Sequence, residues 1–179
     1  PSTVSTRRLV NTWRMSVLGR YQAGGGGFGH DADQTFLRRA GHQLALAAWF
    51  GHCLSRKIVA AEHDLILPLP LHPSRLQTRG FNQSTEIARA ISRASGIPMN
   101  THSLTRSRAT PPQAALPLKE RAQNVRGAFE CSADLVGQRV LLVDDVMTTG
   151  STLRECARIL KLHGAAQITV VVAARALRH

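Results

Sequence analysis

The sequence predicts an α/β fold in which helices flank a parallel sheet. Residues 140–143 form a continuous apolar run, as in a strand that is buried on both faces, and residues 168–173 are apolar except for Thr169 and predict a second buried strand. Apolar residues recur at helical spacing over residues 36–58, 87–94 and 152–163. Because strands and helices alternate along the chain, we expect the strands to be parallel and ligands to bind at their carboxyl ends.

The chain is strongly basic. Its 179 residues, 43% of them hydrophobic, are enough for one domain with a proper core. Lys and Arg outnumber Asp and Glu by 23 to 11, so the formal charge of +12 attracts polyanions such as nucleotides or nucleic acid. Aromatic residues make up only 4%, which disfavours a stacking platform for single-stranded nucleic acid. Charge alone does not separate these ligands from general solubility.

The cysteines are Cys53, Cys131 and Cys156, an odd count without a C-x-x-C pair. This spacing indicates neither a disulfide framework nor a zinc ribbon, so we expect no bound zinc and a reducing, cytoplasmic compartment. No apolar run approaches the ~18 residues of a membrane-spanning helix, so we expect no membrane partner.

Residues 1–35 are predicted to be a flexible basic arm, and residues 36–179 to form a single α/β domain. Four arginines precede the first acidic residue, Asp31, and four consecutive glycines at 24–27 break any regular structure. An organelle transit peptide has the same arginine-rich, acid-free composition, and a start codon assigned too early is a further alternative. The glycine run is not a P-loop, because no Gly-Lys-Ser/Thr follows it.

The amino-terminal half of the domain is predicted to hold a helix and then a strand. The helix spans about residues 36–58, with one buried stripe. The strand spans residues 65–68, and Pro68 and Pro70 end it because proline donates no ladder hydrogen bond. The polar, basic residues 71–80 are expected to form a loop.

A second helix is predicted to follow, capped by Asn82 and ended by Gly96. After it, a short strand is expected near residues 101–105. The stretch 106–127 then shows no period and carries five basic residues and three prolines. A loop of this length is usually functional or disordered, so both a lid and a disordered surface loop are alternatives.

The carboxyl-terminal half is predicted to be strand, strand, helix, strand. The strands are residues 129–133, the central 139–143 and the last 168–173. The helix spans about residues 152–163, and Thr152 to Glu155 matches a capping box at its start.

The candidate site is the stretch 141–152, where the central strand passes into a helix. Asp144 and Asp145 come at the carboxyl end of the strand, and small, mostly hydroxylated residues follow: Thr148, Thr149, Gly150, Ser151 and Thr152. Hydroxyls, backbone N–H groups and a helix N-terminus together form an anion cradle. The two carboxylates suit sugar hydroxyls or a hydrated Mg²⁺ instead. Spacing alone leaves an ordinary strand–turn–helix as an equal alternative.

The same stretch resembles the phosphoribosyl diphosphate (PRPP) motif of type I phosphoribosyltransferases. Three more stretches, at residues 79–83, 106–113 and 121–129, resemble the ComF family, phosphoribosyltransferase-like proteins linked to bacterial DNA uptake. They read Arg-Gly-Phe-Asn-Gln, Arg-Ser-Arg-Ala-Thr-Pro-Pro-Gln and Arg-Ala-Gln-Asn-Val-Arg-Gly-Ala-Phe. The four motifs occur in the family's order, and the resemblance covers about residues 64–175. It implies that residues 36–179 are a phosphoribosyltransferase-like domain, with a type I phosphoribosyltransferase-like sheet and a flexible lid loop.

The resemblance also implies a role for each matching residue. Asp144 and Asp145 would be the catalytic pair, holding the ribose hydroxyls with Mg²⁺ bound nearby, and residues 148–152 would cradle the 5′-phosphate. Residues 106–127 would close over the sugar and exclude water. Phosphoribosyl transfer from PRPP to an unknown acceptor is the implied reaction. The other residues implied to bind substrate are Leu71, His72, Arg75, Arg79, Arg106 and Arg108.

The sequence departs from the ComF pattern in two places. ComF-like proteins commonly begin with a four-cysteine zinc ribbon, for which residues 1–35 offer no counterpart. Residues 115–117 read Ala-Leu-Pro where the family usually has Gly-Leu-Ser, so an added proline would stiffen the predicted lid. Two other functions stay open. One is a non-catalytic accessory in DNA uptake that binds nucleic acid weakly or a competence helicase partner, and the other is a PRPP-sensing regulator.

Overall fold

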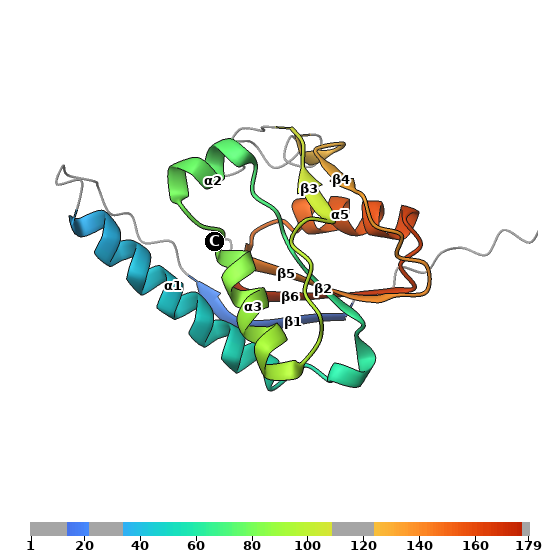
Figure 1. Cartoon of the computed structure of the whole chain (residues 1–179), viewed down its shortest axis with the longest axis horizontal. Helices are drawn as coiled ribbons and strands as arrows, with labels where there is room; N and C mark the ends of the chain where they lie inside the picture. Colours follow the sequence, from blue (N-terminus) through green and yellow to red (C-terminus); the bar gives the residue numbers. More distant parts are fainter. Residues whose placement is uncertain (1–13, 22–33, 109–123, 177–179) are drawn as a thin grey trace, which may run out of the picture.

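The computed structural model describes residues 14–21, 34–108 and 124–176 (Figure 1). Within them, four parallel strands form one sheet in the order β1-β6-β5-β2. A separate antiparallel pair consists of β3 (Leu104–Arg106) and β4 (Phe129–Cys131). The parallel sheet with flanking helices confirms the predicted fold class. The strands of the sheet are β1 (Arg14–Tyr21), β6 (Gln167–Ala176), β5 (Arg139–Met147) and β2 (Leu65–Pro68).

The central strand β5 is buried on both faces, because its alternate side chains enter two different cores. Val140 and Leu142 pack with α5 (Ser151–Leu162) and the β3–β4 pair. Leu141 and Val143 pack on the other face with α1 (Gln34–Ser55) and α3 (Gln83–Ser95). Figure 1 shows α1 and α3 together and α5 apart from them. Burial on both faces explains why residues 140–143 of this strand are apolar at every position instead of alternating.

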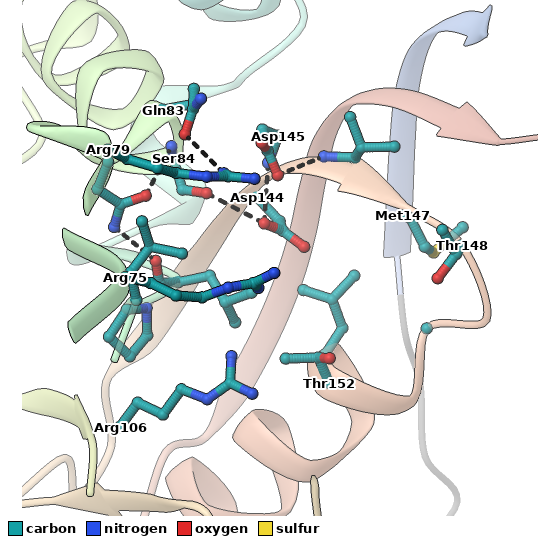
Figure 2. Close-up of a pocket in the computed structure, with 17 residues that line it drawn as sticks. Arg75, Arg79, Gln83, Ser84, Arg106, Asp144, Asp145, Met147, Thr148 and Thr152 are labelled. Atoms are coloured by element: carbon teal, nitrogen blue, oxygen red, sulfur yellow. Dashed lines mark hydrogen bonds between the residues drawn. The ribbon is translucent and has the colours of Figure 1, made fainter. Parts of the chain in front are cut away.

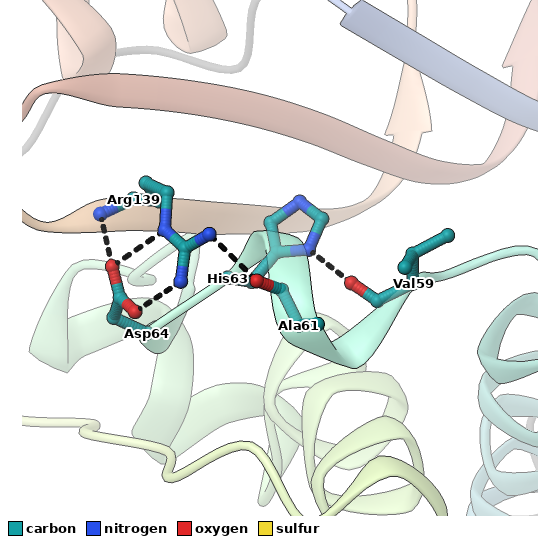
Figure 3. Close-up of polar contacts among 5 residues, drawn as sticks. All are labelled: Val59, Ala61, His63, Asp64 and Arg139. Atoms are coloured by element: carbon teal, nitrogen blue, oxygen red, sulfur yellow. Dashed lines mark hydrogen bonds and ion pairs between the residues drawn. The ribbon is translucent and has the colours of Figure 1, made fainter.

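An ion pair joins the amino ends of β2 and β5 (Figure 3). Arg139 donates from Nη2 and Nε to the carboxylate of Asp64 at 2.6 and 3.0 Å, and from Nη1 to the carbonyl of Ala61 at 2.6 Å. These hydrogen bonds from Arg139 hold the pKa of the Asp64 carboxyl well below its usual range. The pair helps to set the register of β2 on β5. Because it lies at the amino ends of the strands, the carboxyl ends stay available to a ligand.

Two predicted helix signals are confirmed, and one is wrong. The Oδ1 of Asn82 accepts the Ser84 N–H at 3.1 Å, and Gly96, with φ of +76°, ends the helix α3. The capping box at α5 does not form, because the helix begins at Ser151 and its N-cap is Gly150, without a side-chain cap. Glu155 instead accepts a hydrogen bond from the Gly127 N–H at 2.9 Å. The carboxylate that a capping box would need is therefore engaged in a tertiary contact.

Residues 71–80 are not a loop, because they contain the helix α2 (Pro73–Arg79). Its boundaries obey local rules: Pro73 stands in the first turn, His72 accepts the Ser74 N–H, and Gly80 ends the helix at φ of +77°. The prediction failed because the segment is short and polar and has no apolar stripe. No buried residue lies in α2, so it presents its side chains to the outside and to the site.

The strand β5 is longer than predicted, and the strand β1 was not predicted. β5 continues to Met147, so Asp144 and Asp145 lie inside its last residues and not after its end. Within the predicted arm, residues 14–21 form the strand β1, which pairs in parallel with β6. Of the other residues up to 35, only Gln34 and Thr35 are described, as the start of α1, so the domain division stays a prediction. No helix among the described residues is both long enough and apolar enough to cross a membrane.

Candidate functional site

A cavity of about 350 Å³ opens at the carboxyl ends of β2 and β5. Its walls come from four parts of the chain: the β2–α2 connection with α2, the first turn of α3, Arg106 of β3, and the end of β5 with the start of α5 (Figure 2). Parallel strands that end side by side leave such a crevice, because the connections after them diverge to opposite faces. The cavity therefore lies where the sequence predicts a ligand site.

Asp144 and Asp145 form the acidic wall of the cavity. Asp144 is only 7% exposed, and its Oδ1 accepts the Ser84 hydroxyl at 3.0 Å and the Asp145 N–H at 2.9 Å. Asp145 is half-buried, and its Oδ1 accepts the Val146 N–H at 2.7 Å. Burial raises the pKa of the Asp144 carboxyl well above its usual range, and the charge of Asp145 raises it further. Two carboxylates held together in this way favour a ligand that supplies hydroxyl donors or a cation.

Three arginines form the basic wall. Arg75 and Arg79 project from α2, and Arg106 projects from β3 with its guanidinium 5.4 Å from the centre of the Phe129 ring (Figure 2). Burial lowers the pKa of Arg106, and the charge of Arg75 lowers it further. An arginine side chain nevertheless stays protonated at neutral pH. Like charges gathered at one wall attract an anionic ligand group, which would relieve their repulsion.

The loop between β5 and α5 divides into two sets of residues. Thr148, Gly150 and Thr152 line the cavity. Thr149 and Ser151 turn to each other instead, with Oγ atoms 2.9 Å apart and the Ser151 N–H donating to Thr149 Oγ1 at 3.2 Å. This contact holds the tight turn at Gly150, which has φ of +71°. The positive end of the α5 dipole therefore borders the cavity.

The structure brings most of the predicted site residues to one cavity, but not all of them. His72 and Arg108 do not line it: His72 caps α2, and Arg108 Nη2 donates to the carbonyls of Asn124 and Arg126 at 3.0 and 2.9 Å. Residues 109–123 of the predicted lid lie outside the described residues, so the lid stays a prediction. The predicted residues that do line the cavity are Asp144, Asp145, Thr148, Gly150, Thr152, Leu71, Arg75, Arg79 and Arg106.

Sequence reasoning missed the first turn of α3 as a wall of the site. Asn82 Nδ2 donates to the Leu69 carbonyl at 2.9 Å, Gln83 accepts from Arg79 at 3.4 Å, and Ser84 holds Asp144. The motif at residues 79–83 contained part of this signal, since Asn82 and Gln83 belong to it. No local pattern marks Ser84, because its partner is 60 residues away.

The residues present fit a magnesium ion that is shared with a ligand. No group of three or more His, Cys, Asp or Glu side chains that could hold a metal occurs within residues 14–21, 34–108 and 124–176. Mg²⁺ in phosphate-binding proteins usually takes one or two carboxylates and completes its shell with water and ligand phosphates. Asp144 and Asp145 offer that donor set.

Comparison with known proteins identifies relatives of both sequence and fold. Residues 77–178, more than half of the chain, match the family model for the phosphoribosyl transferase domain. DNA utilization protein YhgH of Escherichia coli (strain K12) is 38% identical over 114 residues, which cover 64% of this chain and 50% of that protein. Competence protein F of Haemophilus influenzae is 34% identical over 142 residues, which cover 72% of this chain and 62% of that protein.

Among solved structures, the allosteric regulatory enzyme of purine biosynthesis matches with a TM-score of 0.50 and 25% identity, over 72% of this chain and 25% of that one. The relatives in sequence confirm the predicted resemblance to competence protein F-like proteins. The chain spans only half to two thirds of the length of the two relatives described above.

Proposed function

We propose that this chain, which belongs to the phosphoribosyl transferase domain family, binds PRPP in the cavity and transfers its phosphoribosyl group to an acceptor. One observation carries the proposal. An acidic wall, a basic wall and a helix N-terminus face a single cavity of about 350 Å³. PRPP is a sugar with phosphates at both ends, so it needs hydroxyl acceptors in the middle and positive potential at two separate places.

The proposed binding mode follows from the chemistry of each wall. The 5′-phosphate lies at the loop with Thr148, Gly150 and Thr152, where backbone N–H groups and the dipole of α5 favour an anion. Asp144 and Asp145 accept hydrogen bonds from the ribose hydroxyls. The 1-diphosphate lies toward Arg75, Arg79 and Arg106, whose guanidinium groups can bind its oxygens in pairs.

Asp144 and Asp145 would also hold Mg²⁺ together with oxygens of PRPP. When bound, Mg²⁺ supplies charge that neutralises the diphosphate and eases its departure. The two aspartates alone give the ion few protein ligands, so we expect it to bind with PRPP and only weakly without it.

The proposed reaction breaks the bond between C1 of the ribose and the diphosphate oxygen, and the diphosphate leaves with the bonding electrons. The sugar then passes through an oxocarbenium-like transition state, as in glycoside hydrolysis. The basic wall stabilises the charge that develops on the leaving diphosphate. A nucleophile, typically a nitrogen, adds to C1 and completes the transfer.

The aspartate pair provides the test. Asp144→Asn and Asp145→Asn should each weaken binding of PRPP with Mg²⁺ by ~1.5–3 kcal/mol, the range for a hydrogen bond to a charged group. That corresponds to roughly ten- to a hundredfold in affinity by isothermal titration calorimetry. Neither variant should melt below the parent, because each substitution removes one of two adjacent like charges.

A matched control is Asp134→Asn. Asp134 is exposed, and its Oδ1 accepts the Val136 N–H at 3.1 Å, away from the residues that line the cavity. This variant should bind PRPP like the parent. Variants at 144 and 145 that melt well below the parent but bind PRPP equally well would show a structural pair. A screen of bases and amines for diphosphate release then separates a transferase from a PRPP sensor, which would bind without turnover.

A second function is a non-catalytic role in DNA uptake, with nucleic acid or a helicase as partner. The names of the relatives, DNA utilization protein and competence protein F, support it, as does the charge of +12. If the parent binds no PRPP at millimolar concentration, this second function takes the place of the first.

A further inference from the structure

Ser84 makes a buried contact with the acidic wall. It stands in the first turn of α3, is 3% exposed, and donates its hydroxyl to Asp144 Oδ1 at 3.0 Å (Figure 2). A buried carboxylate without hydrogen-bond donors destabilises the fold, so the position of a donor determines the orientation of the carboxylate.

The contact selects between the two oxygens of Asp144. Both described donors, the Ser84 hydroxyl and the Asp145 N–H, reach the same atom, Oδ1. The carboxylate plane is therefore set, and the second oxygen is turned toward the cavity (Figure 2). Without the hydroxyl, the side chain would keep one donor and could rotate about its last bond, for which the energy profile is broad.

Ser84 is itself held from two sides. The Oδ1 of Asn82 accepts the Ser84 N–H, and Asn82 Nδ2 ties the same turn to the Leu69 carbonyl at the end of β2. Further along α3, Ile87 and Ile91 are buried in the core that also contains residues of β5. The donor and its acceptor therefore sit on two elements that pack against each other, so their separation is fixed by the fold.

The donors to Asp144 are also uncharged. A lysine or arginine at this place would orient the carboxylate but would neutralise it and compete with a ligand. A serine hydroxyl and a backbone N–H orient it without bringing a positive charge of their own. Outer partners of this kind are known to tune the ligand affinity of carboxylates at metal sites.

We propose that Ser84 is a positioning residue, which aims the second oxygen of Asp144 into the cavity for PRPP and its Mg²⁺. This inference rests on the proposed function. It assigns Ser84 no contact with the substrate, so its whole effect must pass through Asp144.

The test is a double-mutant cycle of Ser84→Ala and Asp144→Asn, read by calorimetric titration of the full chain with PRPP and Mg²⁺. Ser84→Ala alone should weaken binding about tenfold or more, as for other outer-shell partners. In the Asp144→Asn background, Ser84→Ala should cause less than about a twofold further loss, because the group it aims is already altered.

The matched control is Ser92→Ala. Ser92 lies in the same helix and donates its hydroxyl to the Ile97 carbonyl at 2.7 Å, at the end remote from the cavity. It should lose stability in thermal melts but not affinity. If Ser84→Ala melts too low to titrate, Ser84→Cys replaces it with the same expected loss, because a thiol is a similar-sized but weak donor.

Each outcome decides the matter. If Ser84→Ala is folded and binds PRPP like the parent, or if its loss persists in full beside Asp144→Asn, Ser84 is not a positioning residue while the proposed function stands. If Ser92→Ala loses as much affinity, the effect is general loosening of α3 and the inference is overturned. If the parent does not bind PRPP, the proposed function fails and the inference fails with it.

Discussion

The crossing of α1 and α3 offers a prediction whose size can be worked from the structure. Gly51 of α1 is buried against α3, and a Cβ atom added to it would lie 2.6 Å from the Cβ of Ala90 and 2.6 Å from the Ile87 carbonyl oxygen. Ordinary carbon contacts are about 3.5–4.0 Å, so the helices would have to separate by roughly 1 Å. One of the two obstructing atoms belongs to the backbone, so no side-chain rotation removes the clash.

Gly51→Ala should therefore destabilise the protein despite a better helix propensity. Overpacking of a core costs about 1–3 kcal/mol, and the upper part of that range applies where a backbone atom obstructs. Replacing a helical glycine by alanine stabilises the helix by about 1 kcal/mol. We expect a net loss of about 2 kcal/mol in the free energy of unfolding. For a chain of this length each kcal/mol corresponds to about 2–4 °C in Tm.

Gly41→Ala is the matched control, because Gly41 lies in the same helix and a Cβ there would meet nothing within 4 Å. It should gain about 1 kcal/mol from propensity alone. The difference between the two variants, about 3 kcal/mol, then isolates the packing cost. Urea unfolding followed by far-ultraviolet circular dichroism measures both. Equal stability of the two variants would refute the close approach of α1 and α3.

Two further predictions concern charge. The pKa of Asp64 in the folded protein is depressed by Arg139 below the ordinary 3.8, so the ion pair stabilises the fold above that value and loses its effect as pH falls through the folded pKa. Thermal melts should therefore place Asp64→Asn below the parent at about pH 6 and show a gap that shrinks below about pH 4; a gap independent of pH would contradict this. Any binding of DNA, measured by fluorescence anisotropy, should fall steeply between roughly 50 and 200 mM salt, because counterion release drives it. Affinity that does not change with salt would indicate a dedicated site instead.

The sequence by itself determined the central elements and the location of the site. Residues 140–143 are apolar at every position, and only a strand between two cores needs such a run, so β5 was predictable from local composition. The helix α3 carries its own cap at Asn82 and its own end at Gly96. Asp144 and Asp145 stand next to the apolar run, so their place at the ligand edge of the sheet followed from chain connectivity.

Other features could not be predicted, because their partners are remote in sequence or their signal is weak. The helix α2 has no buried face, and its stability depends on Pro73, Gly80 and the cap by His72, which periodicity does not detect. The strand β1 exists through its pairing with β6, which follows it by about 150 residues. The capping box at α5 was a sound local prediction, but the N–H of Gly127 takes Glu155 away from it.

The tertiary structure alone decided how the candidate site is divided and supported. Thr149 and Ser151 are small hydroxylated residues like Thr148 and Thr152, but their side chains hydrogen-bond to each other. Only Thr148 and Thr152 line the cavity, because the turn at Gly150 alternates the directions of successive side chains. Arg106 joins the site through its stacking on Phe129, a contact between two strands. Ser84 reaches Asp144 across 60 residues, which only the packing of α3 on β5 brings together. Local sequence encodes which polar and charged groups stand at the end of β5, and long-range packing determines which of them line the cavity.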